Sequence, residues 1–271
     1  MQSRILFLIH NLAGGGAQRV VTLWAEILSK QNYQVTVLTY YPLPNEYPLD
    51  PQIKRVNLFA TFDGYDQIPQ KSMARKKRLE RYLAANPQDL VLPFVTDANL
   101  LATFCDQTQI KCVTPNLRNS PWEKEKGVDL VLRDWAIQKQ GSVILQNHEQ
   151  TTYFNRPEFA HVRKYIVHNP LHPAIANIEK ASYGPIKKIV AVGRLVPQKN
   201  HTLIIEAVRI LRDEFHENYQ LDIYGTGELQ TNLQAQIDEA QLNDQVQLCG
   251  RCNDIFPVLI NYDLFLMTSH Y

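Results

Sequence analysis

The sequence predicts an α/β protein made of two consecutive doubly wound units, each a parallel sheet with helices on its faces. Short apolar runs that suit buried strands alternate along the chain with segments whose apolar residues recur at helical spacing. The alternation stops at a proline-rich segment and then begins again. At 271 residues the chain is long enough to form two domains, each with its own core.

The first unit is expected to span residues 1–168. The apolar run Ile5–Ile9 predicts its first central strand, and the loop at 11–17 leads into a helix. Further strands are predicted at 34–40, 89–95, 111–114, 142–146 and 161–168, and a basic helix at 68–83. Asn147 and Gln150 have the spacing of a capping box for one more short helix.

Prolines and weak periodicity mark residues 169–186 as an interdomain linker. The second unit then spans residues 187–271. Strands are predicted at 188–192, 221–224, 246–249 and 264–268, with helices that end near 215, 240 and 260. This unit has about half the length of a usual α/β domain, so we expect its sheet to be incomplete.

The loop after the strand at 188–192 carries the main candidate site. Pro197 is expected to keep this loop out of a helix, and Asn200 to cap the helix that follows. That helix is expected to bury a face made of Leu203, Ile204, Ala207, Val208 and Leu211. Arg194 and Lys199 are thus held where open α/β sheets bind ligands, and two cations beside a helix N-terminus suit a diphosphate. The alternative is that both are solvated loop charges.

Two glycine loops also follow predicted strands. Gly14–Gly16 would let a backbone approach a ligand closely at a helix start. It does not fit a dinucleotide fingerprint, whose third glycine would fall at Arg19, nor a P-loop. Tyr224–Gly227 is a second loop of this kind. A tight turn without a ligand is the alternative for Gly14–Gly16, and the Gly-x-Gly of the second loop is weak evidence by itself.

Together these motifs resemble a known family. The run Val-Gly-Arg-Leu-x-x-x-Lys-Asn at 192–200 looks like the donor-diphosphate loop of the retaining glycosyltransferases of group 1 (family 4), which have the GT-B fold of two Rossmann-like domains. In the family's order, the chain also carries Gly-Gly-Ala at 15–17, Tyr-Gly-x-Gly at 224–227, a loop at 247–254 and Met-Thr-Ser at 267–269. Gln18 stands where the family usually has Glu, and Glu228 where Pro is common.

The resemblance implies roles for named residues. Arg194 and Lys199 would stabilise the diphosphate leaving group. Donor-binding positions would be Gly15, Gly16, Gly225, Gly227, Arg251 and Ser269. Arg118, Asn119 and Asn147 match cleft-lining segments more loosely and could equally be polar loop residues. No metal ligand is implied, and the sequence has no Asp-x-Asp pair of the kind that holds Mn²⁺ or Mg²⁺.

The implied function is transfer of a sugar, with retention and without a cofactor, from a nucleotide-sugar, expected to be a UDP-sugar, to a glycan or lipid-linked acceptor in cell-surface polysaccharide synthesis. The family continues past Ser269 with a Glu-Gly pair and a second Glu, whereas this sequence ends at Tyr271. We therefore expect the chain alone to be inactive. The alternative is a truncated, non-catalytic nucleotide-sugar binder that partners a full transferase. A dinucleotide-dependent oxidoreductase is a third, more distant reading.

Composition sets further limits. The net charge of +1 gives no reason to expect nucleic acid as a partner, and four cysteines suggest a reducing compartment. With no signal peptide or membrane-spanning run, a cytoplasmic location is expected. The basic helix Lys71–Arg81 is either a solvated face or a contact with an anionic membrane surface. Cys249 and Cys252 are expected to be structural, and His168 and His172 to be loop histidines, because Pro170 prevents a helix between them.

Overall fold

The structure is a computed structural model that describes residues 2–122, 127–171, 173, 175, 184–252 and 254–270. The chain divides into two compact units, Met1–Pro170 and Leu171–Tyr271. The division falls within the segment predicted as a linker, of which residues 176–183 lie outside the described part, as do His172, Asn253 and Tyr271.

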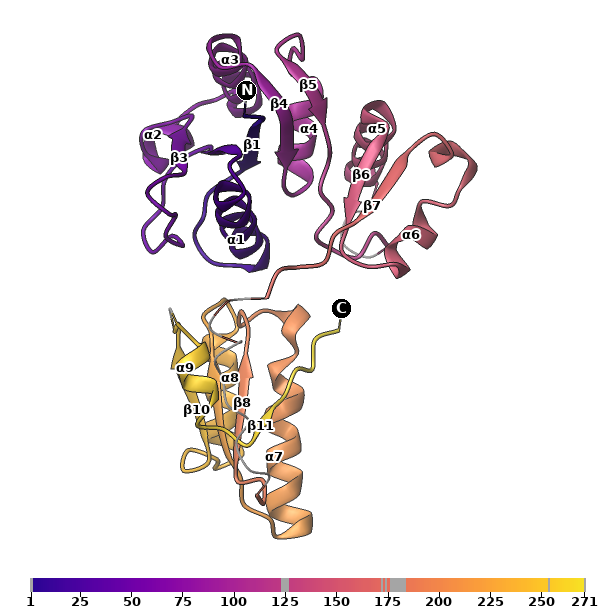
Figure 1. The fold of residues 1–271 in the computed structure, drawn as a ribbon. Coiled ribbons are helices and arrows are strands. Elements are labelled where there is room, and N and C mark those ends of the chain that lie inside the picture. The colour runs from indigo at the N-terminus through magenta and orange to yellow at the C-terminus, as the bar shows by residue number, and fades with distance from the viewer. Residues whose placement is uncertain are drawn as a thin grey trace. The chain divides into compact units, whose positions relative to one another are not determined.

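The first unit contains a parallel sheet of the order β3-β2-β1-β4-β5 (Figure 1). Its strands are β1 (Arg4–Ile9), β2 (Gln34–Thr39), β3 (Lys54–Asn57), β4 (Gln88–Pro93) and β5 (Ile110–Val113). A second parallel pair is formed by β6 (Ser142–Leu145) and β7 (Arg163–Ile166). Asn116 bridges to both Phe94 and Ile144, so it continues the pairing from the end of β4 to β6.

Alternate residues of β1 divide the first unit into two cores. Ile5, Phe7 and Ile9 pack with α1 (Gly16–Lys30) on one face. Leu6 and Leu8 pack on the other face with α3 (Lys71–Ala85) and α4 (Thr96–Phe104). The remaining helices are α2 (Phe62–Asp66), α5 (Val128–Gln140), α6 (Glu149–Tyr153) and the 3₁₀ turn η1 (Pro157–Phe159). Because helices cover both faces of a parallel sheet, this unit is doubly wound as predicted.

The second unit contains a four-stranded parallel sheet of the order β10-β9-β8-β11 (Figure 1). Its elements are β8 (Lys188–Val192), η3 (Pro197–Lys199), α7 (His201–Phe215), β9 (Gln220–Tyr224), α8 (Gln230–Glu239), β10 (Val246–Gly250), α9 (Phe256–Leu259) and β11 (Leu264–Phe265). Apolar residues of α7 and α8 pack with β8 and β9 in one core. The strand predicted at 264–268 is shorter, because Thr268 turns its hydroxyl to the carbonyl of Asn200 at 2.8 Å.

Several elements were not predicted, and each lacks the expected apolar pattern. The strand β3 is half-exposed, and α4 has only nine residues. In α5 a fully buried arginine, Arg133, occupies a core position and interrupts the apolar period. None of the helices in the described part of the chain has the length and apolarity that crossing a bilayer requires.

Candidate functional site

The loop after β8 carries Arg194 and Lys199, but its local structure differs from the prediction. Pro197 does not exclude helix here; it begins the 3₁₀ turn η3, because its fixed φ suits a first helical position. Asn200 adopts the left-handed conformation (φ 48°, ψ 46°) and makes no side-chain capping hydrogen bond to α7. Instead it ends η3, with its N–H donated to the carbonyl of Pro197 at 3.1 Å.

The buried face of α7 is also different from the predicted one. It consists of His201, Ile204, Ile205 and Val208, whereas Leu203 is 51% exposed. Left-handed Asn200 re-orients the chain just before the helix, and the helix begins directly with the buried His201. An apolar period alone could not reveal this shift.

The structure leaves both loop cations available to a ligand. Arg194 is exposed and Lys199 is half-buried. Among the described residues neither side chain forms an ion pair or a hydrogen bond. The aliphatic stem of Lys199 lies across Gly193, where an added Cβ would stand 3.3 Å from its Cγ. A side chain at Gly193 would therefore require the stem of Lys199 to shift by a few tenths of an ångström, so the glycine leaves room for this stem.

His201 lies beneath this loop and is 4% exposed. Burial lowers the pKa of His201, although the nearby backbone of Arg194 and Gly193 opposes the shift. The ring is therefore neutral at pH 7 and supports the loop without adding charge. The sequence analysis did not single out this residue, although a histidine directly after Lys-Asn was a visible signal.

Gly225 and Gly227 serve the packing of one loop on another. A Cβ at Gly225 would lie 1.8 Å from the carbonyl oxygen of Gly193, and one at Gly227 would lie 2.3 Å from that of Leu195. The N–H of Leu195 donates to the carbonyl of Thr226 at 3.0 Å. The two loops thus form a single backbone platform at the carboxyl ends of β8 and β9, and this accounts for both glycines without a ligand.

Arg251 and Ser269, the other two residues predicted to bind the sugar donor, lie at the same edge of the second sheet. The carbonyl of Gly250, just before Arg251, accepts a hydrogen bond from Gly225 N at 2.8 Å. Next to Ser269, the N–H of His270 donates to the carbonyl of Gln198 at 2.9 Å. The predicted residues of this unit therefore gather where parallel α/β sheets bind ligands.

In the first unit, the glycine loop between β1 and α1 is anchored by a residue from another part of the chain, Glu46. Leu12 N donates to Glu46 Oε1 at 2.9 Å, and Glu46 is in turn paired with Arg55 at 2.8 Å. Gly15 has φ +99°, and a Cβ there would lie 2.7 Å from the side-chain oxygen of Gln18. A Cβ at Gly16 would meet nothing within 4 Å. Gly15 is thus required by the turn, whereas the absence of a side chain at Gly16 leaves room for a ligand.

Arg118, Asn119 and Asn147 follow strands or bridges of the first unit at its carboxyl edge. The guanidinium of Arg118 lies 4.4 Å from the ring centroid of Trp24 and donates to Asn169 Oδ1 at 2.9 Å. Burial lowers the pKa of Arg118 to about 10, so it remains charged at pH 7. These contacts give it a packing role besides any contact with a ligand.

The amides nearby order the turn before α6. Asn147 Oδ1 accepts from Gln150 N at 3.0 Å, as a capping box requires, but the side chain of Gln150 accepts from Gln146 N instead of Asn147 N. Gln150 also donates to the carbonyl of Asn119 at 2.9 Å. Only half of the predicted capping box is therefore formed.

A charged cluster that the sequence analysis missed lies at the same edge of the first unit. His10 Nε2 is 3.1 Å from Asp97 Oδ2, which also accepts from Arg75. Burial opposes the ionisation of Asp97, but the hydrogen bond with His10 and the charge of Arg75 outweigh it, so the pKa of Asp97 lies below its ordinary value. His10 and Asp97 are 87 residues apart, and no local pattern connects them.

The predicted basic face of α3 is not a continuous exposed surface. Arg75 is 8% exposed and lies inside the first unit. Lys71 pairs with Asp66 and Lys76 with Glu80, while Arg78 donates to the carbonyl of Leu58. Charge composition alone predicted one cationic face, but the helix turns one arginine inward and neutralises two lysines.

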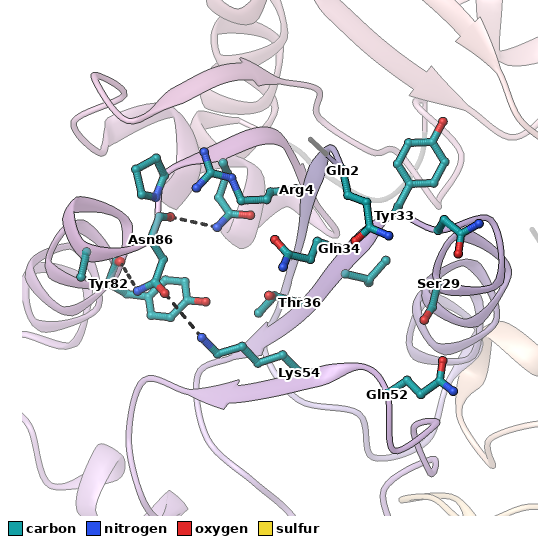
Figure 2. Close-up of a pocket in the computed structure, with 15 residues that line it drawn as sticks. Gln2, Arg4, Ser29, Tyr33, Gln34, Thr36, Gln52, Lys54, Tyr82 and Asn86 are labelled. Carbon is teal, nitrogen blue, oxygen red and sulfur yellow. Dashed lines mark hydrogen bonds between the residues drawn. The ribbon is translucent and has the colours of Figure 1, made fainter.

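A pocket of about 550 Å³ in the first unit contains none of the predicted site residues. It lies at the amino ends of β1, β2 and β4, whereas the predicted site residues of the first unit lie at the opposite, carboxyl edge of the sheet. Figure 2 shows polar side chains from several elements around it, with Lys54 directed to Asn86. Lys54 Nζ also lies 5.5 Å from the ring centroid of Tyr82.

Cys249 and Cys252 are free thiols, and the described residues contain no cluster that could hold a metal ion.

Comparison with known proteins shows which family and fold this chain resembles. Residues 177–271 match the model of the family described as glycosyl transferases group 1. The sucrose-phosphate synthase from Thermosynechococcus elongatus has the same fold, with a TM-score of 0.78 at 15% identity over 100% of this chain and 76% of that one. The predicted resemblance to group 1 glycosyltransferases and the GT-B fold are thereby confirmed.

Individual relatives narrow the comparison. The chain is 24% identical, over 93% of its length and 69% of the relative's, to a GalNAc-α-(1→4)-GalNAc-α-(1→3)-diNAcBac-PP-undecaprenol α-1,4-N-acetyl-D-galactosaminyltransferase from Campylobacter jejuni. It is 21% identical to the amylovoran biosynthesis glycosyltransferase AmsD of Erwinia amylovora, over 99% of this chain and 75% of AmsD. HepE from Anabaena, solved with UDP and glucose, has a TM-score of 0.73 at 15% identity over 99% of this chain and 74% of HepE.

Proposed function

We propose that this protein transfers a sugar from a UDP-sugar to a glycan or lipid-linked acceptor, with retention at the anomeric carbon and without a metal ion. The observation that carries the proposal is the pair of cations Arg194 and Lys199, which stand on one loop at the carboxyl edge of the second sheet without an acidic partner among the described residues. Two such charges suit the diphosphate of a nucleotide-sugar.

The mechanism follows from where negative charge develops. When the bond between sugar and diphosphate breaks, the leaving diphosphate gains charge, and Arg194 and Lys199 would stabilise it as it forms. Two fixed cations supply the positive charge that a metal ion provides in other transferases. Gly225, Gly227, Arg251 and Ser269 would line the donor site, and Gly16 would admit the ligand in the first unit.

The choice of substrates is supported by the relatives. HepE was solved with UDP and glucose, and the Campylobacter relative is a transferase of N-acetylgalactosamine in a lipid-linked glycan. Membrane contact through α3 is not included, because Arg75 is buried. A reducing cytoplasmic location, which suits the free thiols, belongs to the same proposal.

The test combines binding and transfer. UDP is titrated calorimetrically in EDTA and again in Mg²⁺, and transfer is assayed from UDP-GalNAc to a GalNAc-terminated oligosaccharide. We expect UDP to bind equally in both buffers and the product to retain the anomeric configuration. Binding without transfer would favour the alternative of a non-catalytic nucleotide-sugar binder. Failure of UDP and UDP-sugars to bind would refute the proposal.

A further inference from the structure

The cluster of His10, Asp97 and Arg75 occupies the topological switch point of the first sheet. His10 directly follows β1, and Asp97 stands in the first turn of α4, after β4. β1 pairs with β4, yet α1 and α4 cover opposite faces of the sheet. Open α/β sheets bind ligands in the crevice that forms at such a point.

The negative charge of Asp97 is compensated by Arg75 from the protein interior, while the other side of the cluster is exposed to solvent. The guanidinium of Arg75 lies 4.8 Å from the ring centroid of fully buried Tyr40 and donates to Asp97. The ring of His10 stands edge-on to the same tyrosine, with centroids 5.1 Å apart. The side chains of His10 and Asp97 are nevertheless 35% and 40% exposed. Their polar atoms are therefore fixed in place and still accessible.

The turn that presents Asp97 is strained. Val95, between β4 and α4, has φ +69° and ψ 157°. A β-branched residue rarely adopts this conformation, and such strained residues are concentrated at functional sites. The strain is maintained by the packing around it, including the hydrogen bond from Asn99 N to Val95 O at 3.0 Å.

We propose that His10 and Asp97 bind hydroxyl groups of the acceptor sugar, an inference that rests on the proposed function. Their mutual contact uses His10 Nε2 and Asp97 Oδ2, so His10 Nδ1 and Asp97 Oδ1 take no part in it. An imidazole nitrogen and a carboxylate oxygen suit a neutral polyol, which donates and accepts hydrogen bonds. A carboxylate repels a diphosphate, so this edge suits the acceptor and not the donor phosphates. Arg75 acts through Asp97 and is a positioning residue.

The first test separates acceptor from donor kinetics. His10→Ala leaves the Asp97–Arg75 pair in place, and His161→Ala is the matched control, an exposed histidine of the same unit that precedes β7. With UDP-GalNAc and the GalNAc-terminated oligosaccharide, we expect His10→Ala to raise the acceptor KM about 10-fold, because the variant loses one hydrogen bond to the acceptor. The donor KM and the rate of donor hydrolysis should change less than about twofold. A rise in the donor KM, or an unchanged acceptor KM, would overturn the inference.

The second test does not require turnover. The chain has eight histidines, and His10→Gln identifies the His10 signal among them in ¹³C-histidine NMR spectra. Methyl α-N-acetylgalactosaminide should shift the His10 signal in the wild type and leave that of His161 in place. A spectrum unchanged by the sugar would overturn the inference even if UDP binds. A shift without UDP binding would support this sugar site while the proposed function fails.

Discussion

The carboxyl edges of the two sheets carry charge in opposite ways. In the first unit Asp97 is held between Arg75 and His10, and cation and carboxylate compensate each other. In the second unit Arg194 and Lys199 have no acidic partner within the described residues. A compensated edge binds through hydrogen bonds, whereas an uncompensated pair of cations attracts an anion. This difference supports our proposal that the diphosphate binds to the second unit and neutral hydroxyl groups to the first.

Removing the uncompensated charge should have the largest effect. We expect Arg194→Ala and Lys199→Ala each to lower kcat by about 10²-fold or more, because under the proposed function each removes a charge that would stabilise the leaving diphosphate. Lys187→Ala is the control: it removes an exposed lysine before β8, at the opposite end of that strand. Near-normal kcat in both loop variants would show that the open charges of the second unit do not serve the reaction.

The glycine loops of the two units should also respond differently. Gly225→Ala would place a Cβ 1.8 Å from a carbonyl oxygen, and we expect it to destabilise the second unit by about 2–3 kcal/mol. Gly16→Ala meets nothing within 4 Å and lies in α1, so it should raise stability by about 0.5–1 kcal/mol. Urea unfolding measures both changes. If Gly16→Ala also weakens UDP binding, the glycine serves the ligand; equal stability losses in the two variants would contradict the comparison.

Breaking the compensated cluster should have a smaller effect on stability. Asp97→Asn leaves the buried Arg75 without its carboxylate, at an expected cost of about 2 kcal/mol, less than for a fully buried pair because Asp97 is 40% exposed. Since the pKa of Asp97 is lowered in the folded protein, its stabilisation is present above the ordinary carboxyl pKa of about 4 and is lost as pH falls through the folded value. All three tryptophans lie in the first unit, so their fluorescence follows its unfolding. An Asn variant with the same stability and acid sensitivity as the wild type would contradict this.

The sequence was sufficient for features encoded by neighbouring residues, and insufficient for features that depend on folding. Strand β8 and the presence of two cations in the loop after it could be predicted because an apolar run, a glycine and these cations are close together in the sequence, whereas the local conformation of the loop could not. The burial of Arg75 could not, because a helix with many cations does not reveal which one faces the core. Nor could the pairing of His10 with Asp97, which arises only when β1 and β4 become neighbours. The conformation of Asn200 was predicted wrongly, because asparagine is common both as a helix cap and in the left-handed conformation.

The smallest expected effect is a difference between the two units in how their stability depends on pH. Burial lowers the pKa of His201, so the second unit should have its full stability above the ordinary histidine pKa of about 6.5 and lose stability as pH falls toward the folded value. Between pH 7.5 and 5.5, hydrogen exchange of the α7 amides, corrected for the intrinsic rate, should therefore become faster, while tryptophan fluorescence of the first unit stays constant. His201→Gln should reduce this pH dependence, since the titrating group is absent. Protonation of the buried, neutral ring of His201 should destabilise the folded second unit. If the protection of α7 were independent of pH over this range, the inference that His201 makes this unit acid-sensitive would be wrong.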